Sequence, residues 1–440
     1  MFRIHGDRMN PVRARLDASP MGSTQIIAVA LAAILSALDG YDVLSVTFVA
    51  PAIVTDWGIG KAMIGVVLSA GLMGMALGSF LLAPIADVVG RRKMILVSLG
   101  LMAIGMLACG FAGSIQSLAF WRLITGLGIG ACVAIINPIS AEFANARRRP
   151  LTVAIMAIGY PVGGVGGGLL AAFLLQHHGW PSVFFAGFVA AAILLPVVAW
   201  LLPESPAWLL SRRGPDRLAR VNAFLIRCGH APVDALPDSP VETRRGYAAV
   251  FAPRQIGATF WMVAINGFAV ATIYYVLSWL PQMVADAGFP PSVASTVSAT
   301  ASLMGVVGGL LLGWLAQRGG LRWLVGFTIL GLGVSTIAFG VAPPSLPLLI
   351  AAAGVCGFFL FGTGTGIYVT LAGTFGDEAR AAGSGFVIGT GRIISAIAPA
   401  VAGGLFASGF GRNEVCFFFG MSSLLSALIL LLGWRRFRRA

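Results

Sequence analysis

Charged residues are scarce in this sequence. Of its 440 residues, 10% are Asp, Glu, Lys or Arg and 58% are apolar, whereas soluble domains carry about 25% charged residues. A water-soluble protein of this length covers its surface with polar and charged side chains. The composition therefore argues against a soluble globular protein and is expected if most of the surface faces lipid.

Cysteine and histidine are also rare, with five and four residues. No pair of cysteines has metal-ligand spacing, and no disulfide framework is apparent. The glycines form no G-x-x-x-x-G-K-[ST] motif, which is the phosphate-binding loop of many ATPases. We expect no metal site, no cofactor and no ATP-binding module, so that any driving force would come from an ion gradient such as that of protons.

Long apolar stretches are abundant instead. A helix needs about 20 residues to cross the bilayer core, and twelve stretches of suitable length occur. They cover residues 24–54, 62–86, 94–112, 118–142, 150–175, 181–202, 255–284, 293–317, 322–341, 346–375, 380–407 and 414–433. The predicted fold class is an all-α polytopic membrane protein with twelve transmembrane helices in two pseudo-symmetric six-helix bundles.

One long polar segment, rich in Arg, Pro and Asp, separates the sixth and seventh stretches. Within it, Asp216 to Cys228 could form a short helix with an apolar face, lying on the membrane surface. The predicted parts are a cytoplasmic tail 1–23, a six-helix bundle 24–202, a cytoplasmic linker 203–254, a second six-helix bundle 255–433 and a basic cytoplasmic tail 434–440.

The two halves resemble each other. The end of the second stretch, 83–92, aligns with the end of the eighth, 313–322, and Ile158-Gly159 matches Ile388-Gly389 at the same offset. Duplicated halves with a binding site between them are typical of secondary transporters. Glycines spaced four apart, such as Gly126/Gly130 and Gly159/Gly163, predict close helix crossings.

The basic residues predict the orientation. Of the 29 Lys and Arg, only Lys61 and Arg412 fall in loops on the side opposite the termini, and Arg122 and Arg392 fall within the spans. Because cytoplasmic loops hold an excess of Lys and Arg, we expect both termini in the cytoplasm and the chain in the cell (inner) membrane. The net charge of +13 is then explained by loops facing anionic headgroups, and no nucleic-acid partner is expected.

Two aspartates lie in the middle of the first span, within Leu38-Asp39-Gly40-Tyr41-Asp42. An ionised side chain there costs about 2.5–3.5 kcal/mol, so its default interpretation is functional. Asp39 and Asp42 share a helix face, and two nearby carboxylates in a low dielectric do not readily stay ionised together. We expect them to couple transport to protons. The alternative is a static ion pair between helices, for instance of Asp39 with Arg122.

Arg122 in the fourth span and Arg392 in the eleventh keep their charge, so each needs an anion. An aspartate could satisfy one, and the carboxylate of a small organic anion the other. Arg392 is the favoured substrate contact, with a purely structural partner as the alternative. Side chains that could line the same cavity are Tyr41, Asn137, Asn266, Tyr274, Tyr275, Trp279 and Tyr368. For each aromatic among them, ordinary packing or an interfacial position is the alternative.

Four further charges, Asp87, Arg91, Glu142 and Arg148, lie at span ends on the predicted cytoplasmic side. They are either solvated or form a cytoplasmic gate whose ion pairs form in one state and break in another.

Three segments resemble motifs of the major facilitator superfamily. Its loop signature is resembled by Asp87-Val88-Val89-Gly90-Arg91-Arg92-Lys93, although Ala83 stands where the opening glycine is usual. The run from Arg122 to Gly130, with Glu142, resembles its fourth-helix motif, and Pro203 to Leu209 resembles the segment after its sixth helix.

More narrowly, Asp39-Gly40-Tyr41-Asp42 and Gly391-Arg392-Ile393-Ile394 resemble the aromatic acid:proton symporter family. The resemblance implies a major facilitator fold, uptake of benzoate-like or hydroxybenzoate-like acids with protons, and roles for Asp39, Asp42, Asp87, Arg122 and Arg392. We expect one chain in the bilayer to suffice. The alternatives are a carrier of another organic anion or a sugar, a drug/proton antiporter, or a membrane receptor that binds aromatic acids without moving them. An enzyme is not expected, because no nucleophile–base set is apparent.

Overall fold

The computed structural model describes residues 11–212, 214–236, 250–253, 255–375 and 380–437. Twelve helical segments within these ranges are long and apolar enough to cross a membrane. They are α2 (Ser23–Trp57), α3 (Lys61–Leu77) continued by η1 (Gly78–Leu82) and α4 (Ala83–Val89), α5 (Arg91–Gly110), α6 (Ile115–Phe143), α7 (Arg149–His177), α8 (Pro181–Leu201), α11 (Ile256–Asp286), α12 (Pro291–Leu315), α13 (Leu321–Val341), α14 (Leu346–Ala372), α15 (Arg380–Ala407) and α16 (Arg412–Phe437). The twelve predicted spans are confirmed, with boundaries that differ by a few residues.

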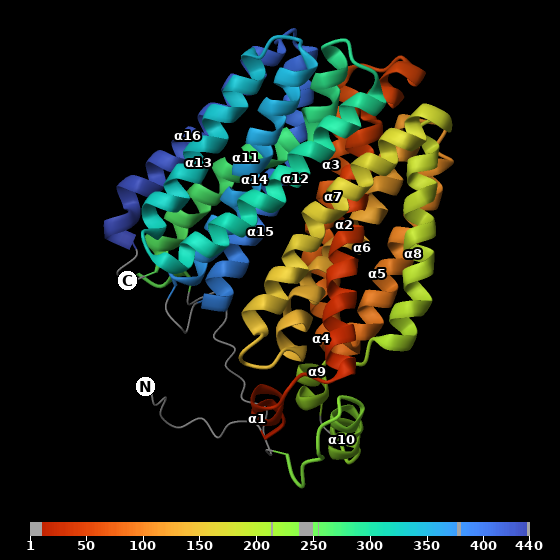
Figure 1. Cartoon of the computed structure of the whole chain (residues 1–440), viewed down its shortest axis with the longest axis vertical. Coiled ribbons are helices and arrows are strands. Elements are labelled where there is room, and N and C mark those ends of the chain that lie inside the picture. Colours follow the sequence, from red (N-terminus) through yellow and green to blue (C-terminus); the bar gives the residue numbers. More distant parts are fainter. Residues whose placement is uncertain (1–10, 213, 237–249, 254, 376–379, 438–440) are drawn as a thin grey trace.

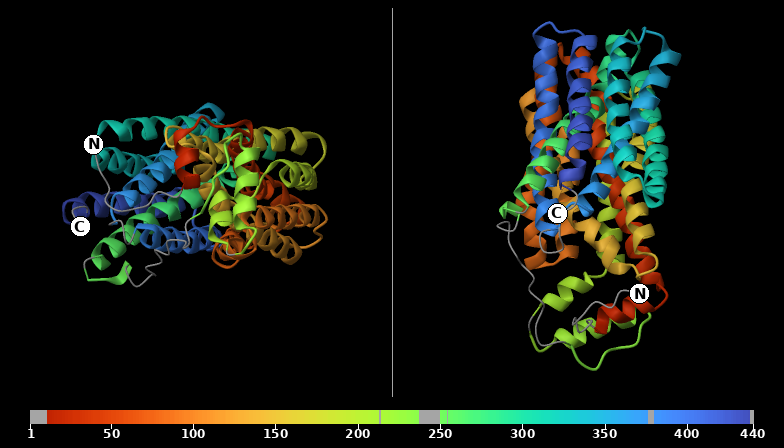
Figure 2. Two further views of the ribbon diagram at one scale, coloured as in Figure 1. Left: turned by 90° about the horizontal axis from the view of Figure 1, so that it is seen from below. Right: turned by 90° about the vertical axis from the view of Figure 1, so that its left-hand side faces the viewer.

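The helices form two halves, α2 to α8 and α11 to α16, which lie side by side in Figure 1. Three short helices, α1 (Pro11–Ala18), α9 (Pro206–Ser211) and α10 (Arg217–Arg227), gather at one end of the molecule (Figure 1 and Figure 2). We call this end the linker end and the opposite one the far end. The helix predicted between Asp216 and Cys228 is confirmed as α10.

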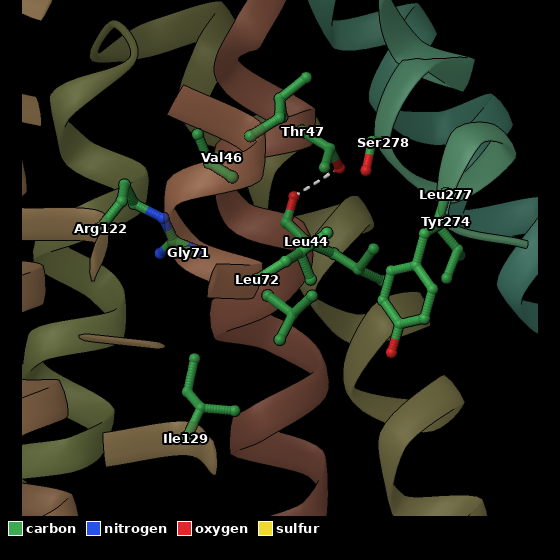
Figure 3. Close-up of a pocket in the computed structure, with 12 residues that line it drawn as sticks. Leu44, Val46, Thr47, Gly71, Leu72, Arg122, Ile129, Tyr274, Leu277 and Ser278 are labelled. Carbon is green, nitrogen blue, oxygen red and sulfur yellow. Dashed lines mark hydrogen bonds between the residues drawn. The ribbon is translucent and has the colours of Figure 1, made fainter. Parts of the chain in front are cut away.

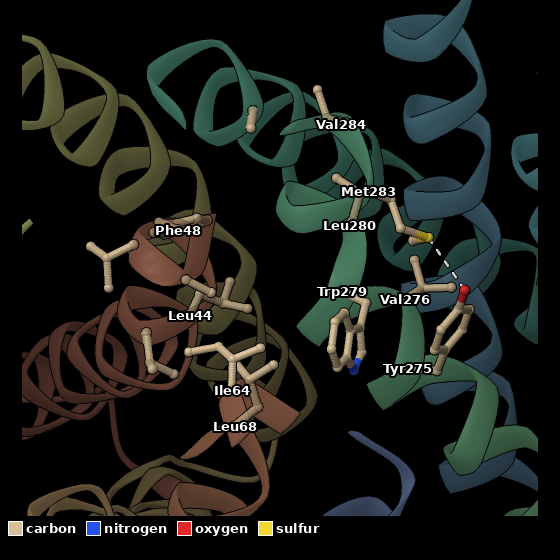
Figure 4. Close-up of a cluster of buried hydrophobic side chains, with 14 of the residues drawn as sticks. Leu44, Phe48, Ile64, Leu68, Tyr275, Val276, Trp279, Leu280, Met283 and Val284 are labelled. Atoms are coloured by element: carbon tan, nitrogen blue, oxygen red, sulfur yellow. Dashed lines mark hydrogen bonds between the residues drawn. The ribbon is translucent and has the colours of Figure 1, made fainter. Parts of the chain in front are cut away.

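The first half and the second half are sealed together toward the far end. A buried apolar cluster there joins Phe48 and Leu68 of the first half to Trp279 and Leu280 of the second (Figure 4). Of the other two large clusters, one lies within the second half. The other joins the first half to α1 and α10, and from the second half Ala396 and Tyr274 reach it. Because apolar contact between the halves is concentrated toward the far end, the structure is closed on that side.

Glycine sets the helix crossings within the first half, as its spacing predicts. A Cβ on Gly163 of α7 would lie 1.9 Å from the carbonyl oxygen of Ala37 in α2. A Cβ on Gly130 of α6 would lie 2.0 Å from the carbonyl oxygen of Met75 in α3. Since no side chain fits at such distances, only glycine lets these backbones touch. The contacts bring α3 and α6, and α2 and α7, together near the middle of the bundle.

The second span is interrupted by a π-helical turn, η1. Such a turn places one extra residue in the helix and rotates the side chains that follow, and it often accompanies a functional position. Here it presents Ser79 toward the carbonyl oxygens of Met75, at 2.9 Å, and of Gly130 in α6, at 2.8 Å.

Candidate functional site

Arg122 and Asp42 form a buried ion pair inside the first half. The Arg122 guanidinium donates to Asp42 Oδ1 at 2.6 Å and to the Asp42 backbone carbonyl at 3.1 Å. The two side chains are 2% and 1% exposed. Gly71 of α3 leaves space for the guanidinium, which would lie 3.1 Å from a Cβ at that position. A buried arginine is stable only with such a partner, so Arg122 already has its anion.

Asp39 has no such partner, although it lies one turn before Asp42. Its side chain is 1% exposed, and within the described ranges neither carboxylate oxygen has a hydrogen-bond partner. The charged groups of Asp42 and Arg392 lie close enough to interact electrostatically with the Asp39 carboxyl group. An ionised carboxylate in this position carries a large desolvation penalty, which protonation removes. The alternative pairing of Asp39 with Arg122 is wrong, because Asp42 occupies that arginine.

Arg392 comes from α15 in the second half and reaches across to the first. Its guanidinium donates to the Ser79 hydroxyl and to the Met75 carbonyl, the latter at 3.4 Å. Both partners are neutral, and no carboxylate of the described residues lies within ion-pair distance of Arg392. Arg392 is therefore a cation between the halves whose nearest contacts leave its charge uncompensated.

Asn266 places Arg392. Its amide on α11 donates to the Val387 carbonyl of α15 at 2.9 Å. A Cβ on Gly391 would lie 2.2 Å from the same amide nitrogen. Asn266 thus joins α11 to α15 just before Arg392.

A small cavity lies between the halves beside Arg122 (Figure 3). Thr47 and Gly71 line it from the first half, and Tyr274 and Ser278 from the second. Its volume of about 10 Å³ is close to the minimum for one water molecule. An aromatic acid does not fit this space, so admitting a ligand of that size requires the halves to move apart.

Tyr41 and Tyr275, two predicted cavity residues, are used within their own halves. The Tyr41 hydroxyl donates to the Val183 carbonyl at 2.6 Å, which ties α2 to α8. Tyr275 stacks on Phe419 with ring centroids 4.2 Å apart. For both, the structure favours ordinary packing over the cavity position.

Three other predicted cavity residues are not among those that line the cavity beside Arg122. The Trp279 indole donates to the Pro399 carbonyl at 3.1 Å and belongs to the apolar seal. Asn137 is exposed and donates to the Val133 carbonyl one turn earlier. Tyr368 is 59% exposed. It nevertheless lies close enough to Tyr274 for the two side chains to interact electrostatically. Of the aromatics predicted for the cavity, Tyr274 is therefore the one that the structure places beside it.

Three of the four predicted gate residues form a network at the linker end of the first half. Arg91 pairs with Glu142 and lies 3.8 Å from Asp87, and Glu142 also accepts from the Ser205 hydroxyl. Arg148 is exposed. Among the residues that the structure describes, none of these ion pairs crosses to the second half, which agrees with a molecule closed at its far end.

An ion pair between the halves does occur at the far end, where the sequence raised no expectation. Lys61 of α3 pairs with Asp286 of α11 at 2.7 Å, and the Gln282 amide donates to the same carboxylate at 2.9 Å. The signal in the sequence was the isolation of Lys61 on its side of the predicted membrane. Ser79 and Tyr160 were missed as well, because a single polar residue in an apolar span carries little signal by itself.

Comparisons with known proteins agree with this architecture. The sequence model of the Major Facilitator Superfamily matches residues 29–290 and 259–440. A gallate transporter of Pseudomonas putida is 30% identical over 96% of this chain and 94% of its own length. A 4-hydroxybenzoate transporter, PcaK, of Pseudomonas aeruginosa is 28% identical over 96% of this chain and 95% of its own.

Solved structures resemble the fold. The xylose transporter XylE from E. coli, in a partially occluded inward open conformation, superposes with a TM-score of 0.75 at 16% identity and covers 94% of this chain and 98% of its own. A bacterial homologue of the lysosomal transporter Spinster, inward-facing, gives a TM-score of 0.71 at 18% identity and covers 95% and 98%. At these identities the likeness concerns the fold alone.

Proposed function

Since the chain belongs to the major facilitator superfamily, and within it to the family of aromatic acid transporters, we propose that it imports a benzoate- or hydroxybenzoate-like carboxylate together with protons. The membrane-spanning fold and the family make it a transporter of aromatic acids. The proposal adds the direction, the coupling ion and the residues. The described residues contain no group of His, Cys, Asp and Glu able to hold a metal ion, so no resident metal enters the proposal.

The unequal partners of the intramembrane charges support this function. Arg122 is neutralised by Asp42, whereas Arg392 contacts a hydroxyl and a carbonyl. A guanidinium can bind a carboxylate through two parallel hydrogen bonds, so Arg392 is the group that we assign to the substrate. Asp39, which is buried and has no hydrogen-bond partner in the described part of the chain, is the group that we assign to the proton.

The two assignments are linked through space. Asp39 and Arg392 come from opposite halves and are electrostatic neighbours. An ionised Asp39 would attract the Arg392 guanidinium and compete with a substrate carboxylate, and the competition is strong in a low dielectric. Protonation of Asp39 leaves the charge of Arg392 for the substrate. We therefore expect the proton to bind before or with the substrate.

Alternating access would use the contact of Arg392 with the first half. In the closed-far-end state, Arg392 holds Ser79 across the interface. A substrate carboxylate that binds the Arg392 guanidinium would weaken its contact with Ser79. The equilibrium between the two arrangements of the halves would shift as a result. Rocking of one half against the other around a central site is the general motion of such duplicated carriers.

The decisive experiment is uptake into proteoliposomes. We would measure accumulation of radiolabelled benzoate and 4-hydroxybenzoate with an inward proton gradient, with and without a protonophore. Accumulation that collapses with the protonophore is expected. Asp39→Asn should abolish accumulation but keep exchange of labelled for unlabelled acid, because the proton site is then permanently neutral. Arg392→Gln should lose both, and the exposed linker variant Arg220→Gln should lose neither.

Other outcomes would redirect the assignment. Uptake of these acids that ignores the proton gradient would contradict symport. Saturable binding without uptake, by protein shown to be folded, would favour the receptor alternative. Full accumulation by Asp39→Asn would remove Asp39 from the coupling mechanism.

We also propose that both termini face the cytoplasm and that the chain lies in the inner membrane. The excess of Lys and Arg at the linker end supports this orientation. A fluorescent protein fused to the carboxyl terminus should fold and fluoresce, and an alkaline phosphatase fused there should be inactive. The reverse pattern would contradict the orientation.

A further inference from the structure

Tyr160 of α7 carries a buried hydroxyl that lacks a partner among the described residues. Within the described part of the chain no hydrogen-bond partner lies within reach of its oxygen, and the oxygen itself is inaccessible although part of the side chain is not. A hydroxyl can donate one hydrogen bond and accept two. Leaving a buried hydroxyl without a hydrogen bond costs about 1–3 kcal/mol. A ligand group that hydrogen-bonds to Tyr160 would therefore be favoured.

The backbone fixes where this hydroxyl lies. A Cβ on Gly40 of α2 would sit 2.1 Å from the Tyr160 carbonyl oxygen, so the two helices touch at this point. Gly159 and Gly163 on either side of Tyr160 also approach α2 closely, since a Cβ on them would lie 2.4 Å and 1.9 Å from its carbonyl oxygens. Tyr160 is thereby held beside the turn that contains Asp39, and the crossing leaves the backbone of Tyr160 little freedom to move.

The Tyr160 ring faces the second half. Its centroid lies 6.3 Å from that of Phe361 in α14. Its electrostatic neighbours are Tyr274 in α11 and Asp39 in α2. Tyr274 in turn lies close enough to Arg392 to feel its charge. The unpartnered hydroxyl therefore belongs to the same region between the halves as the two groups assigned above to the proton and the carboxylate.

We propose that the Tyr160 hydroxyl is a specificity determinant that hydrogen-bonds a hydroxyl group on the ring of the substrate, and so favours hydroxylated aromatic acids over unsubstituted ones. This inference rests on the proposed function. A buried protein hydroxyl that pairs with a ligand hydroxyl discriminates strongly against an analogue without it, because that analogue leaves the protein group unpaired. Phe361, facing the Tyr160 ring, provides an apolar surface for the substrate ring.

The test compares Tyr160→Phe with the unchanged protein in proteoliposomes. Competition against labelled 4-hydroxybenzoate would be measured with unlabelled 4-hydroxybenzoate, benzoate and 4-fluorobenzoate, which lacks a hydroxyl donor. The unchanged protein should favour the hydroxylated acid by about tenfold, equal to roughly 1.4 kcal/mol. Tyr160→Phe should lose this preference through weaker binding of the hydroxylated acid, with benzoate affinity unchanged.

A matched control removes another unpartnered hydroxyl. Ser98 of α5 is fully buried, and its hydroxyl likewise has no partner within the described ranges, but its backbone packs against Gly128 of α6 inside the first half. Ser98→Ala should therefore leave the preference among the acids intact. If Tyr160→Phe fails to fold, equal binding of 4-hydroxybenzoate and 4-fluorobenzoate by the unchanged protein would still overturn the inference.

Several results would overturn the inference. An unchanged protein that binds the three acids equally well has no hydroxyl recognition to explain. An equal loss of uptake for benzoate and 4-hydroxybenzoate in Tyr160→Phe would place the tyrosine in the proton step beside Asp39 or in packing. Failure of the unchanged protein to take up any aromatic acid would instead remove the proposed function, and this inference with it.

Discussion

Asp39 and Asp42 lie three residues apart on one helix and yet have different surroundings. Asp42 accepts two contacts from Arg122, one on its side chain and one on its backbone carbonyl, while the side-chain oxygens of Asp39 accept none among the described residues. At the scale of a residue, burial alone therefore does not define a role. The partner decides whether an intramembrane charge stabilises the fold or remains available for chemistry.

This difference predicts that the two aspartates contribute unequally to stability. Asp42→Asn leaves the Arg122 guanidinium buried without its anion and should lower the free energy of unfolding by about 3–5 kcal/mol. The double variant Asp42→Leu with Arg122→Met should recover most of that loss, because no charge remains buried. Asp39→Asn should change stability little. Thermal unfolding in detergent measures all three, and a larger loss for Asp39→Asn than for Asp42→Asn would contradict the assignment.

His230, at the linker end, predicts a pH dependence. Its Nε2 lies 2.8 Å from Gln25 Oε1, and burial, with the nearby charge of Arg15, holds the pKa of His230 below its ordinary value of 6.5. The docked linker thus binds this proton more weakly than the undocked one. The stability that the contact provides is present above pH 6.5 and is lost as the pH falls through this value toward the lower folded pKa.

The measurement is hydrogen exchange of the α10 amides at pH 7.5 and pH 5.5, corrected for the intrinsic exchange rate. Protection should fall at the lower pH. His230→Gln, which can still donate to Gln25, should remove the difference between the two values. Equal protection of α10 at both pH values in the unchanged chain would show that His230 does not control the docking.

At the scale of an element, the crossing of α2 and α7 positions both Asp39 and Tyr160. The crossing depends on Gly40 in one helix and on Gly159 and Gly163 in the other. Ridges of ordinary side chains would hold the axes farther apart. The same glycines that bring the backbones into contact therefore place the proton site beside the tyrosine hydroxyl.

Two glycines of α7 provide a matched test of this crossing. Gly163→Ala places a Cβ 1.9 Å from the Ala37 carbonyl oxygen, so the helices must separate. Such overpacking should cost about 1–3 kcal/mol and reduce uptake. Gly166→Ala, one turn away, meets nothing within 4 Å and should leave both stability and uptake intact or slightly raise stability. The test is to measure the unfolding midpoint and the initial uptake rate of each variant. Equal losses in the two variants would contradict the role of the crossing.

For the whole molecule, the apolar seal and the Lys61–Asp286 pair hold the far end closed. The pair is about one-third exposed on each side chain, at 35% and 34%. A pair of this exposure contributes about 0–1 kcal/mol. It can therefore bias two arrangements of the halves by up to about fivefold without locking either.

Breaking this pair should shift the molecule toward the arrangement that is open at the far end. Lys61→Ala or Asp286→Ala should increase the labelling rate of a single cysteine placed at Leu280, inside the seal, up to about fivefold. Exchanging the two charges, Lys61→Asp with Asp286→Lys, should restore slow labelling. Arg220→Ala breaks an exposed pair with Asp216 at the start of α10 and serves as the control. Unchanged labelling in both single variants would mean that the seal acts without the ion pair.

Composition and periodicity by themselves determined the number of spans, their approximate limits, the linker and the presence of four costly charges within the membrane. They suffice for this because lipid imposes length and apolarity on every spanning helix, one segment at a time. Glycine spacing likewise indicated close crossings before any contact was known. The family resemblance, carried by the segments around Asp39 and Arg392, also came from the chain alone and is confirmed by the relatives.

Only the tertiary structure decided which charges pair, because pairing depends on where helices cross. It joined Arg122 to Asp42 rather than to Asp39 and directed Arg392 to Ser79 in the opposite half. It placed Tyr41 and Tyr275 in contacts within their own halves and brought Tyr160 close to Asp39. These outcomes depend on helix rotation and on glycine contacts between segments that are distant along the chain. The local hydrophobic pattern carries no information about such contacts.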